Sequence, residues 1–316
     1  MRPSPSAILV ALVLLAGARS GTAEARGLFG HSRPEGGARA GTVDPLGTQC
    51  WRTGRGAPSA TIVFLHGLGC TPRDPLIQRL VRELDHRGDS FLVVAPWLRP
   101  ASLNRRGELI SSGTQTMSDQ LRRARQLLDQ QDGPVVLLGH SFGGKAALEL
   151  AREYPDKVAC VVGLAPSVNM LYSYWKRLTG ERGLPDDRGV IHRRLDAYRG
   201  ELRRQLGAAR GLEAMQLRGE LDYLAVMKDL VSFDEARVER GLERPTLVLH
   251  GTDDQAVSIH YARRLAEANP GVRLVEIPEV GHGFAERASV DGSRGPVIRQ
   301  LAGEISEFID AHQGGR

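Results

Sequence analysis

The stretch "PVVLLGHSFGGKAALELAREYP", from Pro134 to Pro155, decides the fold. Its first part is a continuous apolar run, and its last part repeats apolar residues at helical spacing. Between them stands Ser141, with Gly139 two residues before it and Gly143 two residues after it. The pattern fits a nucleophile exposed on a sharp strand-to-helix turn, and it also fits a serine that caps a helix. The other segments of the chain distinguish these two roles.

Apolar runs and helical patterns alternate along the chain on both sides of this stretch. The expected strands are "ATIVFLHG", "SFLVVAPW", "PVVLLG", "VACVVGLAP", "PTLVLHG" and "RLVEIP", with helices between them. One of these helices, "SDQLRRARQLLDQ", is expected to be capped by Ser118 or Asp119. Strands that are apolar throughout are typical of a parallel sheet with helices on both faces. The sequence therefore predicts an α/β fold with a doubly wound, mostly parallel sheet.

One segment interrupts the alternation. Residues 168–243 contain helical patterns rich in arginine and tyrosine and no convincing strand. An insertion of this length between two core strands predicts a helical subdomain rather than a loop. We expect a helical cap over a site at the carboxyl edge of the sheet, where ligands bind in such folds. A surface decoration is the alternative. The core then comprises residues 47–167 and 244–316.

The N-terminal residues form a separate feature. A basic start, an apolar run from Ala7 to Ala18 and small residues after it predict a secretory signal peptide over approximately residues 1–25. The run is shorter than the ~20 apolar residues that span a bilayer, so an uncleaved membrane anchor is the weaker alternative. Residues 26–46 are expected to be a flexible leader. The protein is then exported to the periplasm or the outside, without a stable membrane span after cleavage.

The distribution of charge bears on whether the protein binds nucleic acid. The net charge is +5 and the pI is about 9.4. The positive residues are nearly all arginines that alternate with acids, as on solvated helix faces, and no nucleic-acid motif accompanies them. We therefore expect no nucleic-acid partner.

The chain has three cysteines. Cys160 lies in an apolar run and is expected to be a buried thiol. Export would allow a disulfide between Cys50 and Cys70.

A serine nucleophile needs a base and an orienting acid, and both kinds of residue follow later strands. The segment "HGTDDQAV" places Asp253 and Asp254 after one predicted strand. The segment "GHGF" places His282 after the next one. The order serine, aspartate, histidine is the one expected when the serine lies on a strand-to-helix turn. The combination favours Ser141 as a nucleophile over Ser141 as a helix cap.

Two backbone N–H groups are candidates for stabilising the oxyanion of an acyl-transfer reaction. One belongs to Phe142, directly after the serine, and the other to Leu68 within "HGLG", at the end of the first strong strand. His66 is expected to brace this loop, His140 to point away from the substrate, and His250 to be packed at a strand end. No histidines have metal-ligand spacing with cysteines or carboxylates, so we expect no metal.

With "HGLG", "GHSFGG", "HGTDDQAV" and "GHGF" in this order, the sequence resembles the α/β-hydrolase superfamily from about Thr61 to Phe308. In that family the acid is the aspartate of G-x-x-D-x-x-V. This motif corresponds to Gly251, Asp254 and Val257, so the resemblance favours Asp254 over Asp253. It implies the α/β-hydrolase fold with an inserted helical cap.

The resemblance implies a serine hydrolase in which Ser141 is the nucleophile, His282 the base and Asp254 the acid, with no cofactor. The expected substrate is a small molecule with a carboxylic ester or a related acyl bond. A thioester, a lipid ester, a small amide, a carbon–carbon bond or perhydrolysis would use the same residues. A binding protein on a hydrolase fold is the non-enzymatic alternative. The family often has "PDLRGxG" after its second core strand, whereas this chain has "PWLRPAS", so Trp97 and Pro100 predict a different pocket wall.

Overall fold

The computed structural model describes residues 39–40, 48–72, 74–96, 98, 101–103, 109–112, 116–233, 241–284 and 295–313. The predicted signal peptide, most of the predicted leader, Trp97 and Pro100 lie outside these ranges. The described residues divide into two compact units. The core unit holds those in 34–98, 119–168 and 235–316, and the helical unit holds those in 99–118 and 169–234.

The core unit is built on an eight-stranded sheet with the order β1-β2-β4-β3-β7-β8-β9-β10. Pairs β1–β2 and β2–β4 are antiparallel, and every other neighbouring pair is parallel. The predicted α/β fold with a mostly parallel sheet is confirmed. The strands are β1 (Arg39–Ala40), β2 (Gln49–Arg52), β3 (Ala60–Leu65), β4 (Phe91–Ala95), β7 (Val135–His140), β8 (Val158–Leu164), β9 (Thr246–Gly251) and β10 (Val272–Ile277).

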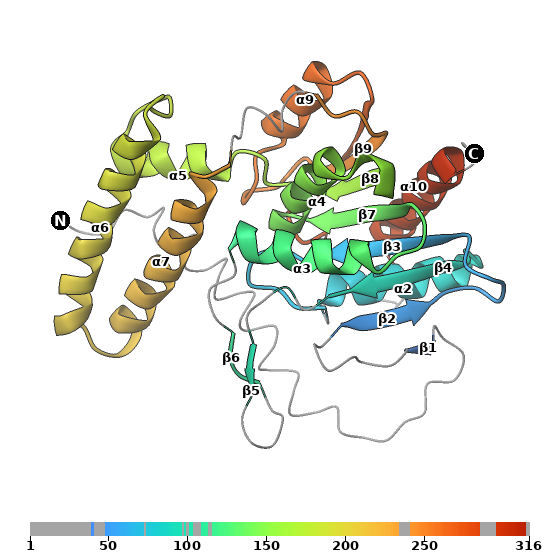
Figure 1. The fold of residues 1–316 in the computed structure, drawn as a ribbon, viewed down its shortest axis with the longest axis horizontal. Coiled ribbons are helices and arrows are strands. Elements are labelled where there is room, and N and C mark those ends of the chain that lie inside the picture. Colours follow the sequence, from blue (N-terminus) through green and yellow to red (C-terminus); the bar gives the residue numbers. More distant parts are fainter. Residues whose placement is uncertain are drawn as a thin grey trace. The chain divides into compact units, whose positions relative to one another are not determined.

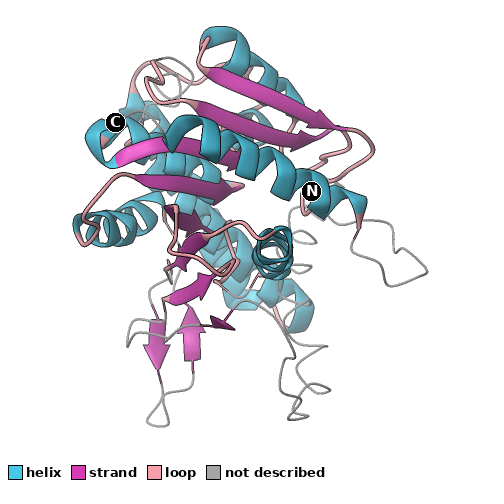
Figure 2. Cartoon of the chain, turned by 90° about the vertical axis from the view of Figure 1, so that its right-hand side faces the viewer, coloured by secondary structure: helices cyan, strands magenta, loops and turns pink. Residues whose placement is uncertain are grey.

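Helices cover both faces of the sheet, as the apolar strands require. In Figure 1, α3 and α4 lie in front of the sheet and α2 and α10 lie behind it, where these two helices pack on each other. Figure 2, turned by 90°, shows the strands between the helices. The helices that the structure describes in the core unit are α2 (Pro75–Arg87), α3 (Met117–Asp129, whose first two residues belong to the helical unit), α4 (Phe142–Glu153), the short 3₁₀ helix η1 (Pro155–Lys157), α9 (Ile259–Ala268) and α10 (Pro296–Gln313).

Helix α2 illustrates why these segments form helices. Its apolar residues recur at helical spacing and are buried: Leu76, Ile77, Leu80, Val81 and Leu84. The Asp74 side chain accepts the N–H of Leu76 at 2.8 Å, which caps the helix start. Gly88 ends the helix with a φ of 85°, a left-handed conformation that glycine adopts without strain.

Three predictions require correction. Neither Ser118 nor Asp119 caps α3, because the helix already includes the fully buried Met117. No disulfide joins Cys50 and Cys70, so the hypothetical bridge between them is not formed. Strands β1 and β2 were not expected, and Arg39–Ala40 pairs with β2 inside the segment predicted to be a flexible leader. Cys160 is buried as predicted, and burial raises the pKa of its thiol to about 12.

Among its described residues, the helical unit contains three helices of the insertion and a small hairpin. The hairpin pairs β5 (Ala101–Leu103) with β6 (Leu109–Ser112), and the helices are α5 (Met170–Thr179), α6 (Arg188–Ala208) and α7 (Gly211–Leu230). The two long helices pack against each other, and Glu220 of α7 accepts hydrogen bonds from Tyr174 at 3.0 Å and Arg177 at 2.9 Å of α5. The insertion is helical, as predicted; its role as a cap stays a prediction.

Candidate active site

The sheet topology brings two loops together at one point. Strand β3 lies between β4 and β7, so the chain winds away from β3 in both directions. Ligands bind in such sheets at the carboxyl ends of the strands, where the winding direction changes. The loop "HGLG" follows β3, and the turn that carries Ser141 follows β7. A Cβ atom on Gly67 would lie 3.3 Å from His140 Nδ1 and 3.4 Å from Ser141 Cβ, so the two loops touch.

The glycines around Ser141 are required by backbone crowding. A Cβ on Gly139 would lie 2.2 Å from the carbonyl oxygen of Gly143. A Cβ on Gly143 would lie 2.0 Å from the carbonyl oxygen of Leu65. No side chain can occupy either position without moving the backbone of β3 or α4. The G-x-S-x-G pattern is therefore a packing requirement of the turn.

Ser141 itself adopts a strained conformation. Its φ is 55° and its ψ is −117°, a region that residues with a side chain rarely occupy, and such strain costs about 1–3 kcal/mol. Hydrogen bonds hold the turn in place. The N–H of Ser141 donates to Leu164 at 2.8 Å, and its carbonyl oxygen accepts the N–H of Ser167 at 3.0 Å. Although Ser141 directly precedes α4, its hydroxyl makes no capping hydrogen bond. The hydroxyl is thereby left available for another partner.

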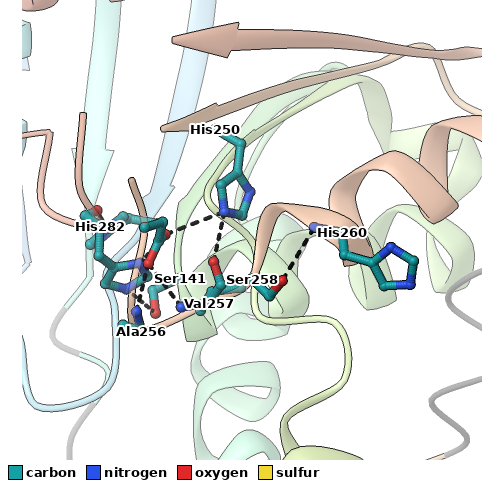
Figure 3. Close-up of polar contacts among 9 residues, drawn as sticks. Ser141, His250, Ala256, Val257, Ser258, His260 and His282 are labelled. Atoms are coloured by element: carbon teal, nitrogen blue, oxygen red, sulfur yellow. Dashed lines mark hydrogen bonds and ion pairs between the residues drawn. The ribbon is translucent and has the colours of Figure 1, made fainter. Parts of the chain in front are cut away.

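That partner is His282. The Ser141 Oγ lies 2.9 Å from His282 Nε2 (Figure 3). His282 Nδ1 lies 2.7 Å from Asp254 Oδ2. Asp254 accepts the Nδ1–H of the imidazole, which leaves Nε2 free to accept the serine proton. The Asp254 side chain is fully buried, whereas 21% of the His282 side chain is exposed. The structure thus joins the three residues in one hydrogen-bonded chain, and Asp253 is not part of it.

Asp254 is held by the loop in which it lies. Its Oδ1 accepts the N–H groups of Ala256 and Val257, each at 2.8 Å, while Oδ2 faces His282 and lies 3.3 Å from Nε2 of His250. Burial alone would raise the pKa of Asp254, but the hydrogen bonds from His250 and His282 outweigh it and hold the pKa below its usual range. The carboxylate therefore stays ionised beside His282.

The loops that carry Asp254 and His282 are tied to each other. The N–H of Thr252 donates to Ile277 at 2.9 Å, and that of Asp253 donates to Val280 at 3.1 Å. A Cβ on Gly251 would lie 2.0 Å from the carbonyl oxygen of Val280, so only glycine fits there. The acid and the base are consequently positioned by one packed unit at the ends of β9 and β10.

The predicted oxyanion donors lie on the two touching loops. In the part of the chain that the structure describes, no group accepts the N–H of Leu68 or of Phe142. His66, fully buried, supports this loop, because its Nδ1 lies 3.1 Å from the carbonyl oxygen of Gly67 and its Nε2 accepts the N–H of Leu98 at 3.3 Å. His66 occupies the bracing position predicted for it.

His140 makes a contact that the sequence did not predict. Its Nε2–H donates to the carbonyl oxygen of His282 at 3.0 Å, and the two rings are 4.9 Å apart. Burial, together with the nearby charge of His282, lowers the pKa of His140 to about 4. The ring is therefore neutral near pH 7, so it holds the His282 backbone without adding a competing charge.

The contacts of His140 with the His282 backbone and of His250 with Asp254 are thus not predicted by the sequence. The position of His140, directly before Ser141, and the spacing of His250, four residues before Asp254, were visible signals. The direction of each side chain depends on how the strand ends, which the sequence does not specify. In the described residues, no three His, Cys, Asp or Glu side chains are grouped so that they could hold a metal ion.

Comparison with known proteins shows which family the chain belongs to. The family model described as "Alpha/beta hydrolase family" matches residues 62–290. The chain belongs to the alpha/beta hydrolase family. A solved structure similar to this fold is Est1E from Butyrivibrio proteoclasticus, with a TM-score of 0.55 and 15% identity over 88% of this chain and 99% of that one.

Two relatives are similar in sequence. A protein of Mycobacterium phage D29, named as a non-heme haloperoxidase, is 31% identical over 230 residues, covering 65% of this chain and 74% of the relative. A pyrethroid hydrolase of Sphingobium wenxiniae is 25% identical over 274 residues, covering 79% of this chain and 88% of the relative. The protein is thus an enzyme of the alpha/beta hydrolase family, which acts on small substrates.

Proposed function

We propose that this protein is an exported serine hydrolase that cleaves a carboxylic ester or a related acyl bond through an acyl-enzyme. The observation that carries the proposal is the hydrogen-bonded chain from Ser141 Oγ to His282 at 2.9 Å and from His282 to Asp254 at 2.7 Å. A serine hydroxyl becomes a nucleophile when a base takes its proton and a third group orients that base. In this proposal Ser141 is the nucleophile, His282 the base and Asp254 the group that orients the base.

The first half of the reaction forms the acyl-enzyme. His282 Nε2 takes the proton of Ser141 Oγ as the oxygen attacks the acyl carbonyl, and Asp254 stabilises the imidazolium that results. The carbonyl oxygen becomes an oxyanion, and we expect the N–H groups of Leu68 and Phe142 to bind it. When the intermediate collapses, the bond to the leaving oxygen breaks. His282 then gives its proton to the leaving alcohol.

The second half releases the acid. Water attacks the acyl carbon and gives one proton to His282 Nε2. The bond from the acyl carbon to Ser141 Oγ breaks, and the proton returns from His282 to the serine. The products are a carboxylic acid and the free enzyme. The strained turn favours both halves, because it presents Oγ outside the helix that follows it.

A fluorophosphonate probe tests the triad directly, because it reacts only with an activated serine. We expect the full chain to be labelled at Ser141, as located by peptide mass spectrometry, and Ser141→Ala to be unlabelled. Turnover of p-nitrophenyl esters of graded chain length should fall in Ser141→Ala by a factor of about 10⁶. A folded wild-type protein that is neither labelled nor active would favour the alternative of a binding protein on this fold.

A second candidate reaction follows from one comparison. The phage relative at 31% identity is named as a non-heme haloperoxidase. If hydrogen peroxide replaced water, its oxygen would attack the acyl-enzyme, and the serine would leave with formation of a peroxy acid. Peroxy-acid release from an ester donor in excess peroxide, absent in Ser141→Ala, would establish this activity. Hydrolysis without peroxy acid would restrict the enzyme to water.

Export is a separate part of the proposal. It is supported by the apolar run from Ala7 to Ala18 and the small residues that follow it. N-terminal sequencing of protein recovered from a secreting host should show a new start near Ala18 or Ala25. In the described residues, no helix is long and apolar enough to cross a membrane. Retention of the first residues on membrane-bound protein would support the anchor instead.

A further inference from the structure

A second histidine contacts the acid of the proposed triad. His250 is the fifth residue of β9 and is fully buried. Its Nε2 lies 2.9 Å from the carbonyl oxygen of Val257 (Figure 3). The same nitrogen lies 3.3 Å from Oδ2 of Asp254. Both neighbours are acceptors, so Nε2 carries the hydrogen and donates to both of them.

The His250 ring contacts the loop through one nitrogen. Nδ1 is buried and has no hydrogen-bond partner within the described residues. The nitrogen that faces the loop is therefore Nε2, which lies against both the carbonyl oxygen of Val257 and the carboxylate of Asp254.

Asp254 has a full set of donors only because of His250. Its Oδ1 accepts the N–H groups of Ala256 and Val257, and its Oδ2 accepts those of His282 and His250. A carboxylate offers about four lone-pair sites, so all of them are used. The side chain cannot rotate about its terminal bond without breaking several hydrogen bonds at once.

His250 also restrains the loop itself. One N–H group on a central strand contacts both the carboxylate of Asp254 and the backbone carbonyl of Val257, three residues later. The segment between them is thus fixed to β9 at both ends. Since β9 is paired on both sides, with β8 and β10, this attachment point is rigid. The other partner of Oδ2, His282, lies on a loop and is partly exposed.

We propose that His250 is a positioning residue that fixes the carboxylate of Asp254 in the orientation that His282 needs. This inference rests on the proposed function. It assigns His250 no contact with the substrate. Its effect is therefore on the rate of the chemical step, and substrate binding is not altered. In mechanistic terms, the base would be oriented by an acid that is itself oriented by a second imidazole.

The test compares variants that keep or remove the donor. His250→Phe keeps a ring of similar size but has no N–H, whereas His250→Gln places an amide N–H near the former Nε2. Thr246→Val is the matched control, since it removes the hydrogen bond of another buried side chain, at the opposite end of the same strand. Each full-length variant is assayed for kcat and KM on one p-nitrophenyl ester, for the rate of fluorophosphonate labelling, and for thermal unfolding.

The expected pattern separates positioning from stability. His250→Phe should lower kcat and the labelling rate by about 10- to 100-fold, as expected for a lost hydrogen bond to a charged group, with KM unchanged within about twofold. His250→Gln should recover kcat to within about threefold of wild type. Thr246→Val should lower the unfolding temperature and leave kcat unchanged.

Two results would overturn the inference. One is a folded His250→Phe protein with wild-type kcat. The other is a loss of kcat in His250→Gln as large as in His250→Phe. Should His250→Phe not fold, His250→Leu replaces it as the variant without a donor, with the same criteria. A wild-type protein that is neither labelled nor active contradicts the proposed function itself, so the two failures are distinguishable.

Discussion

At the carboxyl edge of the sheet, Asp254 accepts four N–H groups and has no exposed side-chain surface. In the helical unit, Asp196 of α6 has one ion pair, with Lys228 of α7 at 2.5 Å, and 53% of its side chain is exposed. Hydrogen bonding lowers the pKa of both carboxyls: that of Asp254 against the effect of burial, and that of Asp196 mainly through Lys228. The same direction of shift thus arises from a buried network in one region and from a surface pair in the other.

This difference predicts in which region a substitution affects activity or stability. A buried carboxylate that loses its orientation disturbs every group around it, because water cannot replace the lost partners. An exposed carboxylate that loses its partner is simply hydrated. Single substitutions at the sheet edge should therefore cause large losses of activity or stability. Single substitutions of exposed residues in the helical unit should cause small ones.

The strongest test of this contrast is Asp254→Asn. The amide would favour the wrong tautomer of His282, and kcat should fall by about 10⁴-fold, as in other enzymes with such a triad. The neighbouring Asp253→Asn is the matched control, because this side chain is exposed and its hydrogen bond in the described structure is with Thr252, whereas His282 is bonded to Asp254. Steady-state ester turnover measures both. Equal losses in the two variants would mean that the structure assigns the acid wrongly.

The second prediction compares two glycines. In Gly143→Ala the new Cβ would lie 2.0 Å from the Leu65 carbonyl oxygen, so we expect destabilisation above about 4 kcal/mol or failure to fold. In Gly219→Ala, within α7, the new Cβ would meet nothing within 4 Å. That change should stabilise by about 0.5–1 kcal/mol, because alanine loses less entropy than glycine in a helix. Urea unfolding measures both, and a tolerated Gly143→Ala would contradict the crowding argument.

The third prediction concerns pH. The folded-state pKa of His140 is lowered from 6.5 to about 4, so the unfolded chain binds more protons between these values. The stabilisation is complete above about pH 6.5 and is lost as the pH falls towards 4, a change of about 3 kcal/mol over the whole window. Urea unfolding at a series of pH values should show this loss in wild type and a smaller one in His140→Gln, which keeps an N–H but does not titrate. Parallel curves for the two proteins would exclude His140 as the source.

The smallest expected effect is in the helical unit. Asp196→Asn removes an exposed ion pair and should cost at most about 1 kcal/mol of unfolding free energy. Added salt should shrink the difference between wild type and variant, since the charges are screened in solution. Ester turnover should not change. A larger cost, insensitive to salt, would mean that this pair resembles the buried network of Asp254.

Much of the fold was predictable, because a continuous apolar run of five to seven residues is a strong signal for a buried strand. Strand β2 was missed because "QCWR" is short, polar at both ends and only partly buried. The start of α3 was misplaced because Met117 fits a buried helix position as well as a preceding one. Such boundaries depend on packing, which no local pattern encodes.

In the candidate site, too, some residues were predictable from the sequence and some contacts were not. Ser141, Asp254 and His282 were identified because each follows a predicted strand within a motif, and the structure brings them together. The contacts of His140 and His250 were not predicted, because a histidine at a strand end has two nitrogens and several accessible rotamers. Only the three-dimensional neighbours decide which nitrogen donates, and to which acceptor.

The order of the strands has a consequence for folding. Ser141 follows β7, Asp254 follows β9 and His282 follows β10, while β8 separates the first of these strands from the second. The three residues come together only when β7, β8, β9 and β10 are paired, so the proposed activity requires the pairing of β8 with β9, which the helical insertion separates in sequence. Such non-local contacts form slowly. Strand β10 has β9 as its single neighbour at the edge of this sheet, and local opening there would silence the enzyme while the rest of the core stayed folded. During unfolding, activity would thus be lost when the sheet edge opens, before any probe of the core detects a change.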